Sequence, residues 1–103
     1  MVLTILEAEV EKRNWGVLKE AYELMTRKIP LTIKSSFLAQ DQSNNAVWRI
    51  LTIWESQEAL TAMRESAKTP TGVLIFEKAN AKPKLTIYDI QKERSNLGQS
   101  QGS

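Results

Sequence analysis

The chain of 103 residues contains no histidine and no cysteine. Without histidine it cannot form a Ser-His-Asp triad, a histidine zinc site or the usual proximal ligand of haem. Without cysteine it cannot form a disulfide, a thiolate nucleophile or a cysteine-bound metal cluster. Any acid–base chemistry therefore requires Glu, Asp, Lys or Tyr. We expect no metal and no haem, flavin or other cofactor, since a GxGxxG dinucleotide motif is also missing.

An excess of charge of one sign is also missing, because 14 Lys and Arg residues are balanced by 12 Asp and Glu residues, for a net charge of +2. The basic residues are spread along the chain and do not form the stripe that binds nucleic acid. The segment MVLTILEAEV has no basic leader, and its apolar run is too short for a signal peptide or a membrane span. We expect a cytoplasmic protein that binds neither nucleic acid nor a membrane.

The hydrophobic pattern predicts one domain over residues 1–93, followed by a disordered polar tail over residues 94–103. Asn14 and Ser56 are expected helix N-caps, and Pro30 is expected to stop the first helix. The polar turn DQSNN joins two strands into a hairpin. The predicted strands are 2–8, 31–40, 47–54 and 84–93, and the predicted helices are 15–29, 57–66 and a short one at 73–79.

This β-α-β-β-α-(α)-β order is typical of the α+β ferredoxin-like fold, in which a four-stranded antiparallel sheet carries its helices on one face. The third strand, VWRILTIW, is largely apolar on both sides. One side packs on the helices, and the other would be bare unless a second subunit covered it. We therefore expect a homodimer, with two sheets packed face to face as a dimeric α+β barrel around a cavity. One side of this strand carries Val47, Arg49, Leu51 and Ile53, and the other carries Trp48, Ile50, Thr52 and Trp54.

Two stretches of the chain, TIWESQEALTAM at residues 52–63 and FLAQDQSNNAVWRI at residues 37–50, resemble the antibiotic biosynthesis monooxygenase family. The first is similar to the family's strand that ends on tryptophan and leads into a helix. The second is similar to the preceding strand, polar turn and strand. The resemblance covers most of residues 1–92 in element order. It implies a homodimeric α+β barrel and one of three activities: cofactor-independent oxygenation of electron-rich hydroxyaromatics, haem degradation, or isomerisation of small metabolites.

The sequence departs from the family pattern at two positions that bear on chemistry. Thr52 stands where members often carry an acidic residue, and Met63 stands where the following helix often carries a histidine. Both changes remove a proton-handling or ligating group and disfavour haem binding. The resemblance then implies a monooxygenase-like protein that acts without a cofactor on a small hydroxyaromatic or quinone-type substrate, with its catalysis retained or degenerate.

Candidate substrate contacts are aromatic, cationic or hydroxyl side chains together with one methionine, whereas the catalytic residue itself is not identified. A tryptophan can stack on an aromatic ring, an arginine can stabilise its anion and a tyrosine can donate a hydrogen bond. Each also has a plainer role. The tryptophans pack cores and dimer interfaces, the arginine forms an ion pair between subunits or lies at an exposed edge, and the tyrosine reaches solvent. The candidates are Arg49, Trp48, Trp54, Tyr88, Thr52 and Met63.

Two other functions fit the same element order. A non-catalytic homodimer that binds a small apolar metabolite, or is only structural, needs no more than the cavity and agrees with the missing histidine. RNA-recognition domains use the same order with aromatic residues on the open sheet face. The strand VWRILTIW, however, lacks their Gly-aromatic pattern and a basic surround, so RNA binding is the least favoured of the three.

Overall fold

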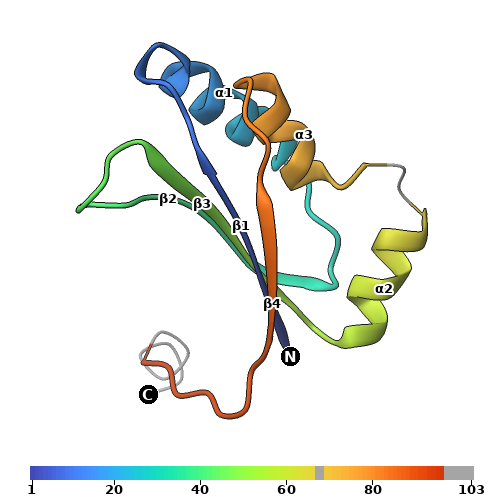
Figure 1. The fold of residues 1–103 in the computed structure, drawn as a ribbon. Helices are drawn as coiled ribbons and strands as arrows, with labels where there is room; N and C mark the ends of the chain where they lie inside the picture. The colour runs from blue at the N-terminus through green and yellow to red at the C-terminus, as the bar shows by residue number, and fades with distance from the viewer. Residues whose placement is uncertain (67–68, 97–103) are drawn as a thin grey trace.

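The computed structural model describes residues 1–66 and 69–96, which form a four-stranded antiparallel sheet with helices packed on it (Figure 1). The sheet order is β2-β3-β1-β4, so the first strand lies between β3 and β4. The predicted α+β ferredoxin-like fold is confirmed, including the second short helix before the last strand. The elements are β1 (Val2–Glu9), the short 3-10 turn η1 (Lys12–Asn14), α1 (Trp15–Met25), β2 (Ile33–Gln40), β3 (Val47–Trp54), α2 (Gln57–Ser66), α3 (Thr71–Lys78) and β4 (Lys84–Asp89).

Helix α1 ends at Met25 and not at Ile29, where the hydrophobic spacing placed its end. The hydroxyl and the amide of Thr26 both donate to the Tyr22 carbonyl, at 2.6 and 3.0 Å. The amide bond is the last i→i−4 bond of the helix, and the hydroxyl adds a second bond to the same carbonyl. At the other end, Asn14 makes no side-chain cap bond. Its φ of −102° and ψ of 2° belong to the preceding 3-10 turn, whereas a capping residue has extended backbone.

The remaining boundaries differ from the sequence prediction by a few residues. Ser56 is confirmed as the N-cap of α2, since its Oγ accepts the Ala59 amide at 3.1 Å. Strand β2 begins at Ile33 and not at residue 31, and β4 ends at Asp89 and not at residue 93. Of the predicted tail, residues 97–103 lie outside the described residues. No helix within the described ranges has the length and hydrophobicity that a membrane crossing requires.

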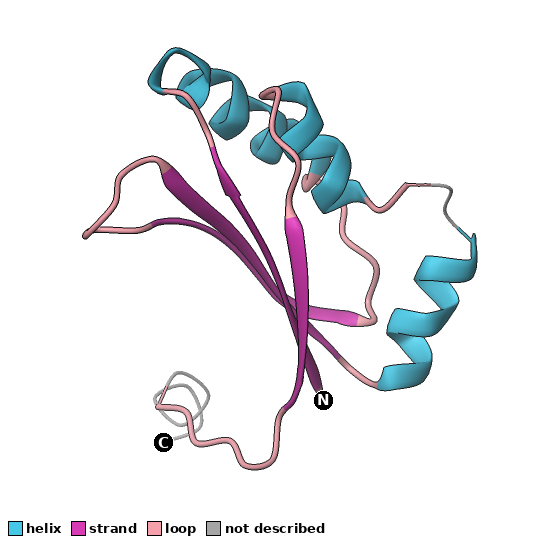
Figure 2. Ribbon diagram, in the orientation of Figure 1, coloured by secondary structure: helices cyan, strands magenta, loops and turns pink. Residues whose placement is uncertain are grey.

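The two faces of the sheet differ in what covers them (Figure 2). The tryptophan side of β3 meets the helices, because Trp48 and Ile50 share a buried cluster with Leu18 of α1 and Phe76 of α3. The other side, which we call the open face, carries none of the helices that the structure describes. Strand register places on the open face Leu3, Ile5, Glu7, Ser35, Phe37, Ala39, Arg49, Leu51, Ile53, Lys84, Thr86 and Tyr88.

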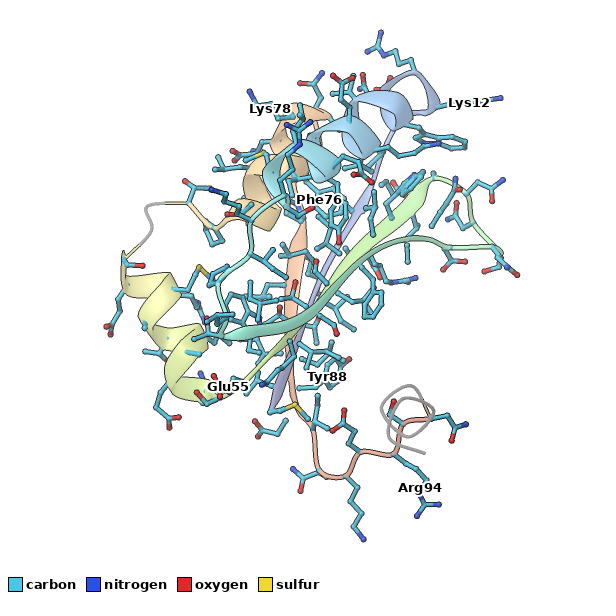
Figure 3. The ribbon with its side chains drawn as sticks, turned by 180° about the vertical axis from the view of Figure 1, so that it is seen from behind. Lys12, Glu55, Phe76, Lys78, Tyr88 and Arg94 are labelled. Carbon is cyan, nitrogen blue, oxygen red and sulfur yellow. The ribbon has the colours of Figure 1, made fainter. Side chains whose placement is uncertain are left out.

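Two buried clusters fill the space between the sheet and the helices. The larger lies under α1 and α3, and Figure 3 shows its Phe76 on the sheet side of α3. Phe76 and Leu18 are both 0% exposed. The smaller cluster consists of Val2, Trp54 and Leu60, and it joins α2 to the sheet. Because the two clusters are separate, the helix side of the sheet is not completely filled between them.

Candidate functional site

A pocket of about 220 Å³ lies between the helix side of the sheet and the helices. It is smaller than the ~300–1,000 Å³ of pockets that enclose drug-sized ligands, so it suits a ligand of one or two fused rings. Gly72, at the start of α3, lets that helix approach β1, since a Cβ there would lie 2.5 Å from Leu6 Cδ1. The large apolar side chains that line the pocket are Leu6, Met25, Ile29, Ile33, Ile50, Trp54, Leu60, Met63, Val73, Ile75 and Leu85.

Three hydroxyl side chains form a row across the sheet side of this pocket. Thr52 on β3 lies opposite Ser36 on β2 and opposite Thr4 on β1 in the strand register. Side chains at paired positions project from the same face, and all three line the pocket. We call Ser36, Thr52 and Thr4 the hydroxyl row. Neighbouring strands lie ~4.8 Å apart, so the row offers hydrogen-bonding groups at successive points along a planar ligand.

Two aromatic side chains donate hydrogen bonds to the two ends of the hydroxyl row. Trp54 Nε1 donates to Thr4 Oγ1 at 3.0 Å, and Tyr22 Oη donates to Ser36 Oγ at 3.0 Å. Thr52, in the middle, has no side-chain hydrogen bond to any residue that the structure describes. A hydroxyl that accepts one bond still has its own hydrogen to donate. The row can therefore present O–H donors to an oxygen atom of a ligand.

The charged side chains at the pocket are all cationic. Lys28, between α1 and β2, and Arg64, on α2, line it with exposed side chains, and no Asp or Glu of the described residues does. Neither cation forms an ion pair within residues 1–66 and 69–96. Nearby positive charge favours the anionic form of a bound phenol and so lowers the pKa of that phenol. Over the same residues, no cluster of three or more His, Cys, Asp or Glu side chains is placed to hold a metal.

Three of the six residues predicted as substrate contacts, Thr52, Trp54 and Met63, line this pocket. Trp48 projects from the same sheet face but is 5% exposed and belongs to the larger buried cluster. Its ring meets the edge of Trp15, with ring centroids 5.8 Å apart. The buried Trp48 Nε1 has no hydrogen-bond partner among the described residues. Trp48 therefore packs the core in this chain and does not line the pocket.

Arg49 and Tyr88 lie on the open face, so the structure does not bring them together with Trp54 in one chain. Arg49 donates from Nε to Glu7 Oε1 at 2.7 Å and from Nη1 to Asp41 Oδ2 at 3.0 Å. Both of these ion pairs are formed within the chain. The Ser43 hydroxyl, and then the Arg49 guanidinium, hold the pKa of the Asp41 carboxyl well below its ordinary value. Tyr88 is 51% exposed.

Sequence reasoning missed Ser36 and Thr4 at the ends of the hydroxyl row, and it missed the cations Lys28 and Arg64. A usable signal was present for Thr4, which is a polar residue on the otherwise apolar side of β1. Thr4 is 7% exposed, which is unusual for a hydroxyl side chain. The alignment of Ser36, Thr52 and Thr4 needs the register of three strands, and neither β2 nor β3 adjoins β1 in sequence.

Comparisons with known proteins show a likeness of fold. No family model and no curated protein sequence matches the chain. The solved structure of an antibiotic biosynthesis monooxygenase matches with a TM-score of 0.66 at 15% identity, over 89% of this chain and 100% of the other. A candidate antibiotic biosynthesis monooxygenase from Deinococcus radiodurans matches with a TM-score of 0.65 at 13% identity, over 92% and 97%. SnoaB, a cofactor-independent oxygenase from Streptomyces nogalater, matches with a TM-score of 0.60 at 9% identity, over 89% and 94%.

Proposed function

We propose that this chain, which has the fold of antibiotic biosynthesis monooxygenases, oxygenates a small hydroxyaromatic or quinone-type substrate without a cofactor. The hydroxyl row in a largely apolar pocket carries the proposal, because it provides hydrogen-bond donors for the oxygen of a phenol beside walls that suit its ring. The fold likeness to a cofactor-independent oxygenase supports it. The volume of about 220 Å³ favours a naphthol-sized substrate.

The chemistry requires the pocket to bind and orient the substrate as an anion. Trp54 and Met63 contact the ring, the hydroxyl row donates to the substrate oxygen, and Lys28 and Arg64 stabilise the negative charge. The apolar walls exclude water, so the electron-rich anion reacts directly with dioxygen. One oxygen atom of O₂ replaces a ring hydrogen as a carbonyl. The other leaves as water with that ring hydrogen and the hydroxyl hydrogen, which gives a quinone.

Oxygen uptake with a panel of naphthols and dihydroxynaphthalenes tests this proposal. We expect uptake above the protein-free rate, with a quinone product, and a loss of about tenfold or more in Thr52→Val, since removing one donor to an oxyanion commonly costs that much or more. Valine keeps the shape of threonine, so the pocket keeps its volume. The matched control is Thr86→Val, the same change on the open face, which should retain the wild-type rate.

The same panel separates catalysis from binding. If the naphthols bind with micromolar affinity while oxygen uptake equals the protein-free rate, the protein is a small-molecule-binding module and the oxygenase proposal is wrong. This second function is favoured by one observation: the described residues that line the pocket include no carboxylate that could act as a general base. If nothing binds, neither function applies to this pocket.

We further propose that the protein is a homodimer in which a second copy covers the open face. In the strand register, Leu51 lies beside Ile5 and Phe37, and Ile53 lies beside Leu3, so apolar side chains are contiguous across the sheet. Phe37 is 53% exposed in the isolated chain. A contiguous apolar patch of this kind usually marks a protein interface.

Sedimentation equilibrium of the wild-type protein tests the dimer. At low micromolar concentration we expect twice the chain mass, because burial of this apolar face favours association. A well-folded monomer under those conditions would contradict the proposed dimer and show that the open face is exposed to water. The pocket would be unaffected by that result, since all of its lining residues belong to one chain.

A further inference from the structure

A proton must leave the pocket whenever a bound phenol becomes its anion, and the lining offers few groups that can take it. Among the described residues, no Asp, Glu, His or Cys lines the pocket. The ammonium group of Lys28 and the guanidinium group of Arg64 are hydrogen-bond donors only, so neither can accept the proton. The hydroxyl groups of the row can relay the proton instead, because each can accept one proton while it gives up another.

Within residues 1–66 and 69–96, one end of the hydroxyl row continues toward solvent. Thr4 is bonded to Trp54 Nε1, and an indole N–H is a donor only, so no proton can pass in that direction. Thr52 has no onward side-chain partner among the described residues. Ser36 is bonded to the hydroxyl of Tyr22 at 3.0 Å, and a phenol hydroxyl can both accept and donate.

Ser36 and Tyr22 also stand between two cavities. Ser36 lines the pocket, and both Ser36 and Tyr22 line a second, open groove beside α1 and β2. Lys19 and Glu23 line the same groove and are exposed, so water has access to it. The hydroxyl pair therefore forms part of the wall between the pocket and solvent. The aromatic ring of Tyr22 packs against the larger buried cluster, which holds its hydroxyl in place.

We propose that the Tyr22–Ser36 hydroxyl pair carries the substrate proton from the pocket to solvent, an inference that rests on the oxygenase function proposed above. The substrate O–H bond breaks and its proton bonds to Ser36 Oγ. The Ser36 proton passes to Tyr22 Oη, and the Tyr22 proton passes to water in the groove. No electrons are exchanged, and the substrate loses one proton. Afterwards Tyr22 donates to Ser36, as in this structure, and Ser36 donates to the substrate anion.

Steady-state oxygen uptake with a naphthol that the wild type oxidises tests this inference in Tyr22→Phe and Ser36→Ala. We expect kcat to fall by about tenfold or more in each variant, because removing a group that transfers protons commonly has an effect of that size. KM should be unchanged. The double variant should be no slower than the slower single variant, because both changes break the same path. Imidazole in the buffer should restore part of the rate, since it can carry the proton through the pocket opening.

The matched control is Ser35→Ala, the same change one residue away on the open face, which should keep the wild-type kcat and show no imidazole effect. If Tyr22→Phe fails to fold, the test rests on Ser36→Ala alone. This change removes one oxygen atom from a strand at the edge of the sheet, so the variant should still fold. A raised KM at unchanged kcat, a slow rate that imidazole does not relieve, or rates equal to Ser35→Ala would each overturn the relay. An inactive wild type would instead refute the oxygenase function, and the relay with it.

Discussion

Replacement of Trp54 by alanine is expected to lower the free energy of unfolding by about 3–5 kcal/mol, the usual cost of removing a large buried aromatic side chain. Trp54 is 6% exposed and packs with Val2 and Leu60 in the smaller buried cluster. Its Nε1 also donates to Thr4 Oγ1. The smaller side chain would extend the pocket into this cluster, and α2 would lose its main contact with the sheet.

Urea unfolding at one fixed protein concentration measures this effect, since the stability of a dimer depends on concentration. Trp54→Phe should cost much less, because it keeps a ring and loses mainly the bond to Thr4, worth about 1 kcal/mol. Leu31→Ala is the control. Leu31 is 95% exposed, and changes at exposed positions usually stay within about 0.5 kcal/mol. An alanine variant as stable as the control would show that Trp54 is not packed as the structure has it.

Replacement of Leu51 by lysine is expected to halve the sedimentation mass at low micromolar concentration while the chain stays folded. Leu51 lies at the centre of the open face, between Ile5 of β1 and Phe37 of β2. In the proposed dimer its side chain would be buried against the partner, and an unpaired charge there is strongly unfavourable. In the monomer the lysine side chain can reach water, so the fold itself should survive.

Leu24→Lys is the matched control for this prediction, because it makes the same chemical change on α1, on the helix side of the molecule. Leu24 is already 50% exposed, so the control should remain a dimer. Circular dichroism of both variants checks that they are folded. If Leu51→Lys sediments as a dimer, or if Leu24→Lys dissociates instead, then the open face is not the interface.

The fold could be predicted from the sequence because its elements are marked by local patterns. Strand β3 was predicted at its observed bounds, since an alternating apolar segment stands between the polar turn DQSNN and the Ser56 cap. The end of α1 could not be predicted in the same way. Ile29 continues the helical spacing, whereas the backbone leaves the helical conformation at Thr26, which has a φ of −110° and a ψ of 11°.

The candidate site could be predicted only in part, because β3 is apolar on both sides. Nothing in its alternation shows which side meets the helices, so Arg49 was grouped with Trp54 although their side chains project from opposite faces. The pairing of Arg49 with Glu7 across two strands also depends on register. Ser36 gave no signal because a serine in an edge strand is ordinary until its tyrosine partner is placed beside it.

The pairing of β4 with β1 affects how the chain folds during synthesis. β1 leaves the ribosome first, yet one of its two neighbours is the last strand, with Val2 opposite Asp89. Contacts between residues so distant in sequence form slowly, because a long loop must be closed first. The hairpin of β2 and β3 can pair with β1 while the other edge of β1 is still unpaired. A chain that stalls before Lys84 therefore exposes a central strand edge, which makes it prone to aggregation and a substrate for chaperones.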